Sequence, residues 1–280
     1  MQLGCHVSVA KGFFKACKRA DELGAGAFQV FTKNPRALRP KKVNYADAEK
    51  GVQFCREHGI TLVAHTPYIT NLSTPKEDLH EVTVRSIKED LHIADTYGAV
   101  GAVVHCGKHV GEGVESGTRR MVETLNEILA EYEGKCLLLL ENTAGQGSEL
   151  GLAVDELVRI REATNHPEKI GFCFDTCHGF ASGAWKPDSF DPLVDQMKET
   201  GYLEALVAIH FNDSKVPYNS RKDRHAPIGK GEIGSEGLAR FLRCESFQGL
   251  PVVLETPVEK EEEYAEEIRF LHQLQQEKTV

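Results

Sequence analysis

The segment CLLLLENTAGQGSELGLAVDELVRIREATNHPEKIGFCFD, residues 136–175, contains the pattern that decides the fold. Two apolar runs typical of buried β-strands, Cys136–Glu141 and Ile170–Asp175, enclose an amphipathic stretch, Ala153–Ala163, that suits a helix. Strands that alternate with helices pair in parallel through right-handed crossovers. Each of the two runs also ends in an acidic residue, which indicates where chemistry could take place.

The same strand–helix unit recurs along the whole chain. Six further apolar runs are expected to form strands: Gln2–Val7, Ala27–Thr32, Thr61–His65, Ala99–His105, Leu206–Phe211 and Pro251–Glu255. The other helices are expected at Gly12–Leu23, Ala46–Glu57, Lys76–Tyr97, Ser116–Tyr132, Pro192–Thr200, Ser235–Cys244 and Glu259–Gln275.

Eight such units within 280 residues, with no linker rich in Gly, Pro or Ser, predict one α/β domain over residues 1–280. Eight units most simply close into a single (β/α)8 TIM barrel, with its active site at the C-terminal rim of the strands. An open doubly wound sheet is the competing fold. It is disfavoured because no G-x-G-x-x-G turn follows the first strand.

The composition limits the classes of function. A net charge of −9 argues against a nucleic-acid partner if taken alone, but bound metal would change this balance locally. No stretch approaches the roughly 18 apolar residues of a membrane span, and no signal-peptide pattern begins the chain. The eight scattered cysteines suggest reduced thiols. We therefore expect a soluble cytoplasmic protein without a membrane partner and, because no exposed apolar helix face stands out, a monomer.

Residues that can bind metal stand at or just after the ends of six successive predicted strands. They are His65, His105, Glu141, Asp175, His178, His210, Asp223, His225 and Glu255. Each alone has an ordinary explanation, since a histidine at a strand end is usually a satisfied polar residue and a carboxylate there is often a helix cap. A barrel, however, brings all of these strand ends to one rim. The joint pattern therefore predicts a metal site.

Four carboxylates packed together would repel one another unless cations were present. Mixed nitrogen and oxygen ligands suit zinc, with Mn²⁺ or Fe²⁺ as substitutes at one or more positions. Nine ligands are too many for one tetrahedral ion, and they suffice for two or three if one carboxylate bridges. Cys173 and Cys177 are not expected to be ligands, because their spacing is not that of a C-x2-C zinc site.

Long motifs around these positions closely resemble the endonuclease IV family, the metal-dependent apurinic/apyrimidinic (AP) endonucleases of DNA repair. The matching segments are AHTPYITNL (64–72), VVHCGKH (103–109), LLLENTAGQGSELG (138–151), FCFDTCHGFASG (172–183), IHFNDSK (209–215), DRHAPIGKGEIG (223–234) and LETP (254–257). CHVSVAKG (5–12) and VFTKNPR (30–36) also look like the family. The resemblance runs nearly end to end and implies a (β/α)8 barrel with three zinc ions.

Carried over residue by residue, the resemblance implies how the nine ligands divide. The first zinc ion would be held by His65, His105 and Glu141. The second would share Glu141 and add Asp175, His210 and Glu255. The third would be held by His178, Asp223 and His225.

The resemblance also implies the reaction. The phosphodiester 5′ to an abasic site in double-stranded DNA would be hydrolysed to a 3′-hydroxyl and a 5′-deoxyribose phosphate. The nucleophile would be a hydroxide that bridges two metals, and Glu141 would position it and accept its proton. Duplexes with blocked 3′ ends are a further expected substrate.

The same resemblance implies contacts to DNA. Arg36, Tyr68 and Ile69 match the positions whose side chains enter the duplex and let the abasic nucleotide flip out, although they could instead cover the barrel mouth. Asn34, Ser8 and the Asn212–Ser214 turn are expected phosphate contacts. Further cations of the rim loops are expected to line a DNA groove: Lys33, Lys41, Lys42, Lys108, Lys215, Arg221, Lys222 and Arg224.

Two other classes of function remain open. A metal-dependent sugar isomerase or epimerase on a similar barrel would generally use one or two metals, which would leave His178, Asp223 and His225 without a purpose. A non-catalytic metal or nucleic-acid binder would not require a fully occupied rim. Nicking of an abasic duplex that is lost after chelator treatment separates the three classes.

Overall fold

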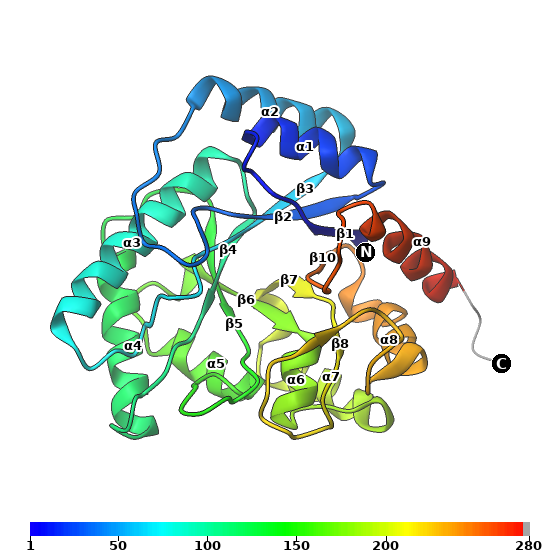
Figure 1. Ribbon diagram of the computed structural model, residues 1–280. Coiled ribbons are helices and arrows are strands. Elements are labelled where there is room, and N and C mark those ends of the chain that lie inside the picture. The colour runs from blue at the N-terminus through cyan, green and yellow to red at the C-terminus, as the bar shows by residue number, and fades with distance from the viewer. Residues whose placement is uncertain (277–280) are drawn as a thin grey trace.

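Eight parallel strands close into a barrel, and helices surround it (Figure 1). The computed structural model describes residues 1–276, so the last four residues of the predicted domain lie outside the described part. The barrel strands are β1 (Gln2–His6), β2 (Ala27–Phe31), β3 (Thr61–His65), β4 (Gly101–His105), β5 (Leu137–Glu141), β6 (Ile170–Asp175), β7 (Leu206–His210) and β10 (Pro251–Leu254). They neighbour one another in the order β1-β10-β7-β6-β5-β4-β3-β2. The predicted (β/α)8 barrel is confirmed.

The predicted helices are found close to the expected positions. They are α1 (Phe13–Glu22), α2 (Tyr45–His58), α3 (Glu77–Thr96), α4 (Val114–Leu129), α5 (Val154–Glu162), α7 (Phe190–Glu199), α8 (Gly234–Leu242) and α9 (Glu263–Gln276). Local chemistry sets their ends, as α2 illustrates. The Asn44 side chain accepts a hydrogen bond from the Asp47 amide at its start, and Gly59 takes a left-handed conformation at its end.

Three short elements were not predicted. They are the helix α6 (Thr176–Ser182) and the antiparallel pair β8 (Asp213–Ser214) and β9 (His225–Ala226). The helix has 7 residues, too few for a helical period to stand out in the sequence. Single turns of 3-10 helix occur at Pro167–Lys169, Pro187–Ser189, Leu203–Ala205 and Glu245–Phe247.

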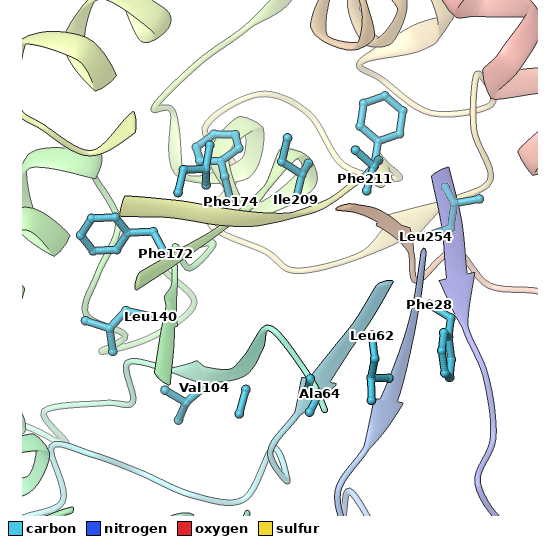
Figure 2. Packing of buried hydrophobic residues seen from close by; sticks show 14 of the residues in the cluster. Phe28, Leu62, Ala64, Val104, Leu140, Phe172, Phe174, Ile209, Phe211 and Leu254 are labelled. Atoms are coloured by element: carbon cyan, nitrogen blue, oxygen red, sulfur yellow. The ribbon is translucent and has the colours of Figure 1, made fainter. Parts of the chain in front are cut away.

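Side chains of the barrel strands alternate between the helix-facing and the inner side. Figure 2 shows Leu62, Val104, Leu140 and Phe172 among the residues that point from the strands toward the helices. The inner side is filled by a separate buried cluster from six strands: Val63, Val103, Leu139, Cys173, Ala208 and Val253. Small residues make room for it, because a Cβ atom on Gly101 would come within 2.4 Å of the Leu139 side chain.

The inner cluster also positions the predicted metal ligands. Side chains two residues apart on a strand share a face. The residue two positions after each member of the cluster therefore points inward at the rim. These residues are His65, His105, Glu141, Asp175, His210 and Glu255. Parallel pairing and this alternation bring six of the nine predicted ligands together above an apolar floor.

All eight cysteines are free thiols, and seven of them are buried. Among residues 1–276, every helix is too short or too polar to traverse a lipid bilayer.

Candidate metal centre

The nine predicted ligands lie together at the C-terminal rim of the barrel. Within the described residues, their ligand atoms form three groups, in each of which all atoms lie within 4.8 Å of one another. The groups are His65, His105 and Glu141; Glu141, Asp175, His210 and Glu255; and His178, Asp223 and His225. This is the division that the resemblance implied, although the role of these residues as ligands stays a prediction.

Glu141 links the first two groups, because its two carboxylate oxygens face different histidines. Its Oε2 lies 3.0 Å from His105 Nε2 and 3.6 Å from His65 Nε2. Its Oε1 lies 2.8 Å from His210 Nδ1 and 3.3 Å from His178 Nδ1. A carboxylate with one oxygen in each group has the arrangement that a bridging ligand requires.

Backbone carbonyl groups orient three of the histidines. The Nδ1 atoms of His65, His178 and His225 lie 2.6, 2.9 and 3.2 Å from the carbonyl oxygens of Thr66, Asn142 and Glu255, respectively. Each Nδ1 is thereby the donor, which leaves Nε2 as the ligand atom. All three Nε2 atoms are buried and have no hydrogen-bond partner within the described residues.

Asp175 caps a helix and also lies in one of the candidate ligand groups. Its Oδ1 accepts a hydrogen bond of 2.7 Å from the amide of His178 and so caps α6. Its Oδ2 accepts a hydrogen bond of 2.7 Å from the side chain of Asn212. The cap places His178 one helical turn from Asp175, which explains how the unpredicted helix brings a third group of ligands to the rim.

Amide side chains that were not predicted to contact the ligands hold the carboxylates. The Asn142 side chain accepts a hydrogen bond from the Asp175 amide, and Asn212 accepts one from the Glu255 amide. Gln29 donates a hydrogen bond of 2.7 Å to Glu255 Oε1. A signal was present for each of them, because Asn142 and Asn212 follow strand ends and Gln29 is the only polar residue of the run AFQVF.

The long loop after β7 supplies Asp223 and His225. Buried Asp213 organises this loop by accepting hydrogen bonds from the amides of Gly231 and Ile233, at 2.9 and 3.0 Å. Asp223 Oδ1 then lies 3.4 Å from His178 Nε2 and 3.3 Å from His225 Nε2.

Cys177 lies close enough to Asp175 and His225 to form an alternative group of ligands. Burial, together with the nearby Asp175 carboxylate, raises the pKa of the Cys177 thiol to about 12. The Cys177 thiol lies 3.7 Å from the carbonyl oxygen of Arg224 and donates to it, whereas His178 and His225 each have a buried Nε2 without a hydrogen-bond partner among the described residues. This favours the group of His178, Asp223 and His225.

The charges of the centre are strongly interdependent. Burial alone would lower the pKa values of His105 and His210, but neighbouring acidic groups, Glu141 among them, outweigh burial and raise both. Burial would likewise raise the pKa of Glu141, yet His210 and His105 hold it well below its ordinary value. The metal-free centre is thus a cluster of histidinium–carboxylate pairs.

The residues present fit a group of divalent cations. The Nε2 atoms of His65, His178 and His225 are buried without a hydrogen-bond partner among residues 1–276. Buried polar atoms are rarely left in this state unless an ion or a water molecule completes them. Imidazole nitrogens mixed with carboxylate oxygens form the ligand set that zinc prefers.

Of the predicted wedge residues, Tyr68 lies directly over this centre. The Tyr68 ring packs against the rings of His65 and His105, with centroids 5.2 and 5.5 Å apart. Arg36 is exposed, and 51% of the surface of Ile69 is exposed. The amide of Tyr68 donates to the carbonyl oxygen of Pro35, so the loops after β2 and β3 are joined. A cavity of about 320 Å³ opens between Tyr68 and the ligands.

Two of the predicted phosphate contacts, Ser8 and Asn34, line a neighbouring cavity, whereas the Asn212–Ser214 turn is fully buried and does not face the surface. Ser8 and Asn34 are exposed and border a space of about 660 Å³ beside His6 and Phe31. The structure thus brings Ser8, from the loop after β1, close to the loop that carries Arg36.

The prediction that Lys33 lines the DNA groove is wrong. Lys33 is buried, and its Nζ lies 3.2 Å from Asp90 Oδ1 and 3.1 Å from Glu89 Oε2, both on α3. It cannot contact a ligand at the surface. The exposed cations of the predicted set are Arg36, Lys42, Lys108, Lys215, Arg221, Lys222 and Arg224, whereas Lys41 is half-buried.

Comparisons with known proteins agree with the motifs. A family model described as a xylose isomerase-like TIM barrel matches residues 17–274. A protein of Symbiobacterium thermophilum named probable endonuclease 4 is 52% identical, over 99% of this chain and 100% of that protein. A protein of the same name in Thermotoga maritima is 34% identical, over 98% and 96%.

Solved structures give the same result. The crystal structure of endonuclease IV from Thermus thermophilus aligns with a TM-score of 0.85 and 33% identity, covering 98% of both chains. A D-tagatose 3-epimerase-like protein aligns with a TM-score of 0.71 over 98% and 99% of the chains, but at 19% identity it shares the fold alone. Because relatives this similar match over almost their whole length, the chain belongs to the endonuclease IV family, as its motifs predicted.

Proposed function

We propose that this chain is a DNA-repair nuclease of the AP-endonuclease type. It hydrolyses the phosphodiester 5′ to an abasic site in duplex DNA and leaves a 3′-hydroxyl and a 5′-deoxyribose phosphate. Three zinc ions would be held by the nine rim residues. The observation that carries the proposal is the position of Glu141, with one oxygen facing His65 and His105 and the other facing His210 and His178.

Zinc bound at this centre would lower the pKa of water to about 7 and neutralise charge on the phosphate. Side chains of the protein would accept the proton and shield the centre from bulk water. Glu141 remains ionised at neutral pH, because its histidine neighbours hold its pKa well below the ordinary value, and it can accept a proton from the attacking water. Tyr68 covers His65 and His105 and limits the access of bulk water.

Bound metals would also explain how a protein with a negative net charge attracts the phosphates of DNA. The net charge is −9, and four of its carboxylates, Glu141, Asp175, Asp223 and Glu255, lie in the centre. Three divalent ions would make this centre positive before substrate binds. The exposed cations of the surrounding loops extend the attraction along the DNA backbone.

Recognition of the abasic site is assigned to Arg36, Tyr68 and Ile69. They lie in two joined rim loops, and both Tyr68 and Ile69 expose about half of their surface although they are large and apolar. Apolar wedges of this kind unstack bases and bend the duplex. A blocked 3′ end carries the same phosphate ester at a 3′ oxygen, so the same residues would serve to remove the block.

The test is nicking of a duplex that contains a single abasic site, with the new ends mapped. The native chain should cut on the 5′ side, lose activity after treatment with a chelator and regain it with zinc. Glu141→Gln should lower the single-turnover rate by about 10²–10⁴-fold, because the group that accepts the proton of the attacking water is lost. His80→Gln is the matched control, since His80 pairs with Glu127 outside the centre.

The competing function would give the opposite result. A zinc-loaded chain that interconverts ketoses and leaves abasic duplexes uncut would be a sugar epimerase. Three zinc ions retained per chain favour the nuclease, whereas one or two favour the epimerase.

A further inference from the structure

We propose that Gln29 is a positioning residue of the metal centre, which holds His210 with Nδ1 as its ligand atom and aims one oxygen of Glu255 at the same ion. The inference rests on the proposed metal-dependent function and extends it to a residue outside the nine ligands.

The contacts of Gln29 set its orientation. Its side chain is fully buried, with Nε2 2.7 Å from Glu255 Oε1 and Oε1 2.7 Å from His210 Nε2. An ionised carboxylate can only accept hydrogen bonds, so the amide nitrogen must face Glu255. The amide oxygen then faces His210 and can only accept. His210 must therefore carry a proton on Nε2.

This proton determines which atom of His210 is free to bind metal. With Nε2 committed to Gln29, the lone pair of the neutral ring is on Nδ1. Nδ1 lies 2.8 Å from Glu141 Oε1 and 3.2 Å from Glu255 Oε2. The other oxygen of Glu255, Oε1, is held by Gln29, so Oε2 is the oxygen left for the ion. One amide thus orients two ligands of the same group.

His210 differs in this respect from the other oriented histidines. His65, His178 and His225 donate from Nδ1 to backbone carbonyl oxygens, which any sequence supplies. His210 instead presents Nδ1 to the centre, and its outer nitrogen depends on a side chain. A single substitution can therefore remove the orientation of His210.

The location of Gln29 supports a role beyond packing. Gln29 pairs in register with Val63 on the neighbouring strand, at the level of the apolar inner cluster just below the ligands. A buried amide in an apolar layer is costly unless its hydrogen bonds are made. Both of the partners that satisfy it are predicted metal ligands.

The test uses Gln29→Met, which keeps the volume but removes both the donor and the acceptor. Zinc retention is titrated with a competing chelator, and ring N–H protons are observed by ¹H–¹⁵N NMR in the metal-free and the zinc-loaded chain. We expect one ion to be lost at a chelator concentration about 10–100-fold lower than for the native chain. We also expect the exchange-protected Nε2–H signal of His210 to disappear in both forms.

Val30→Ala is the matched control. Val30 is the next residue of β2 and packs in the buried cluster on the helix-facing side. It should lower stability without changing zinc retention or the His210 signal. If Gln29→Met does not fold, the same measurements are made on Gln29→Ala, which removes the amide and leaves a smaller side chain.

The outcomes are distinct. A folded Gln29 variant that retains zinc like the native chain and keeps the protected signal overturns the positioning role alone. A native chain that retains no zinc overturns the metal centre and the positioning role together.

Discussion

Ile69 is predicted to contact DNA but is not a predicted metal ligand, so its substitution tests DNA recognition without changing the metal centre. Half of its surface is exposed in a rim loop, next to a tyrosine that packs on two predicted ligands. We expect Ile69→Ala to weaken binding to an abasic duplex about 10-fold, or ~1.4 kcal/mol, because an apolar wedge is lost from the base stack. Its stability should change by less than about 0.5 kcal/mol, as for other exposed positions. Fluorescence titration with abasic and intact duplexes, and thermal unfolding, measure both effects.

Leu79→Ala is the control, because Leu79 is a similarly exposed apolar residue at the start of α3. It should leave DNA affinity unchanged. If Ile69→Ala binds the abasic duplex as tightly as the native chain does, Ile69 covers the barrel mouth and has no part in recognition.

At the residue scale, the sequence predicted which side chains would gather but not what holds them. The nine candidate ligands could be found because each stands at or near a strand end, and parallel pairing brings strand ends together. Gln29 could not be assigned, since its partners lie 181 and 226 residues away. The sequence predicts Lys33 for the DNA groove, because the position of a lysine in a loop does not reveal a buried partner such as Asp90.

At the scale of elements, ion pairs of Lys33 link the loop after β2 to α3. Its buried Nζ contacts Asp90, while the amide of Lys41 at the far side of the loop donates to Glu89. Lys33→Met would leave the Asp90 carboxylate buried without its cation. We expect a loss of about 3–5 kcal/mol in the free energy of unfolding at pH 7.5, measured by chemical denaturation.

The loss should depend on pH. Burial already raises the pKa of Asp90 to about 6, although Lys33 opposes this effect. Without Lys33 this pKa rises further, so Asp90 takes up a proton more readily and becomes neutral as the pH falls. The deficit of Lys33→Met should therefore be smaller at pH 5 than at pH 7.5. Lys42→Met, in the exposed part of the same loop, should cost almost nothing. A deficit that is equal at the two pH values would contradict this account.

The boundaries of an element can be predicted where a long segment shows hydrophobic periodicity. They are harder to predict where a single polar contact sets the boundary. The helix α6 follows its strand without a loop and is capped by Asp175, a residue that also belongs to the ligand groups. The pair β8 and β9 lies in a loop whose far end is held by the buried carboxylate of Asp213. Neither contact produces hydrophobic periodicity in the sequence, so the sequence predicts loops for both segments.

At the scale of the whole molecule, the barrel concentrates opposite charges at one end, and stability should report their titration. The pKa values of His105, His178 and His210 are raised, because nearby acidic groups outweigh burial. Stability from a raised histidine pKa is fully present below the unfolded value of about 6.5 and is lost as the pH rises through the folded value.

The carboxylates act in the opposite direction. The pKa values of Glu141 and Glu255 are lowered, chiefly by His210 against the effect of burial. Their contribution is present above the unfolded value of about 4.3 and is lost as the pH falls through the folded values. The two windows overlap between about pH 4.3 and 6.5, so the metal-free chain should be most stable there.

Zinc should reverse the trend above this window. Bound zinc requires neutral imidazoles and ionised carboxylates, so it replaces the protons of the metal-free centre. The Tm of the metal-free chain should therefore fall between pH 6 and pH 8.5, while the increase in Tm on adding zinc should grow over the same range. Calorimetry with and without a chelator measures both. In Glu141→Gln one of the carboxylates that raise the histidine pKa values is missing, so the fall in the metal-free Tm should be smaller. A metal-free Tm that rises from pH 6 to pH 8.5 would mean that the rim histidines are neutral before metal binds.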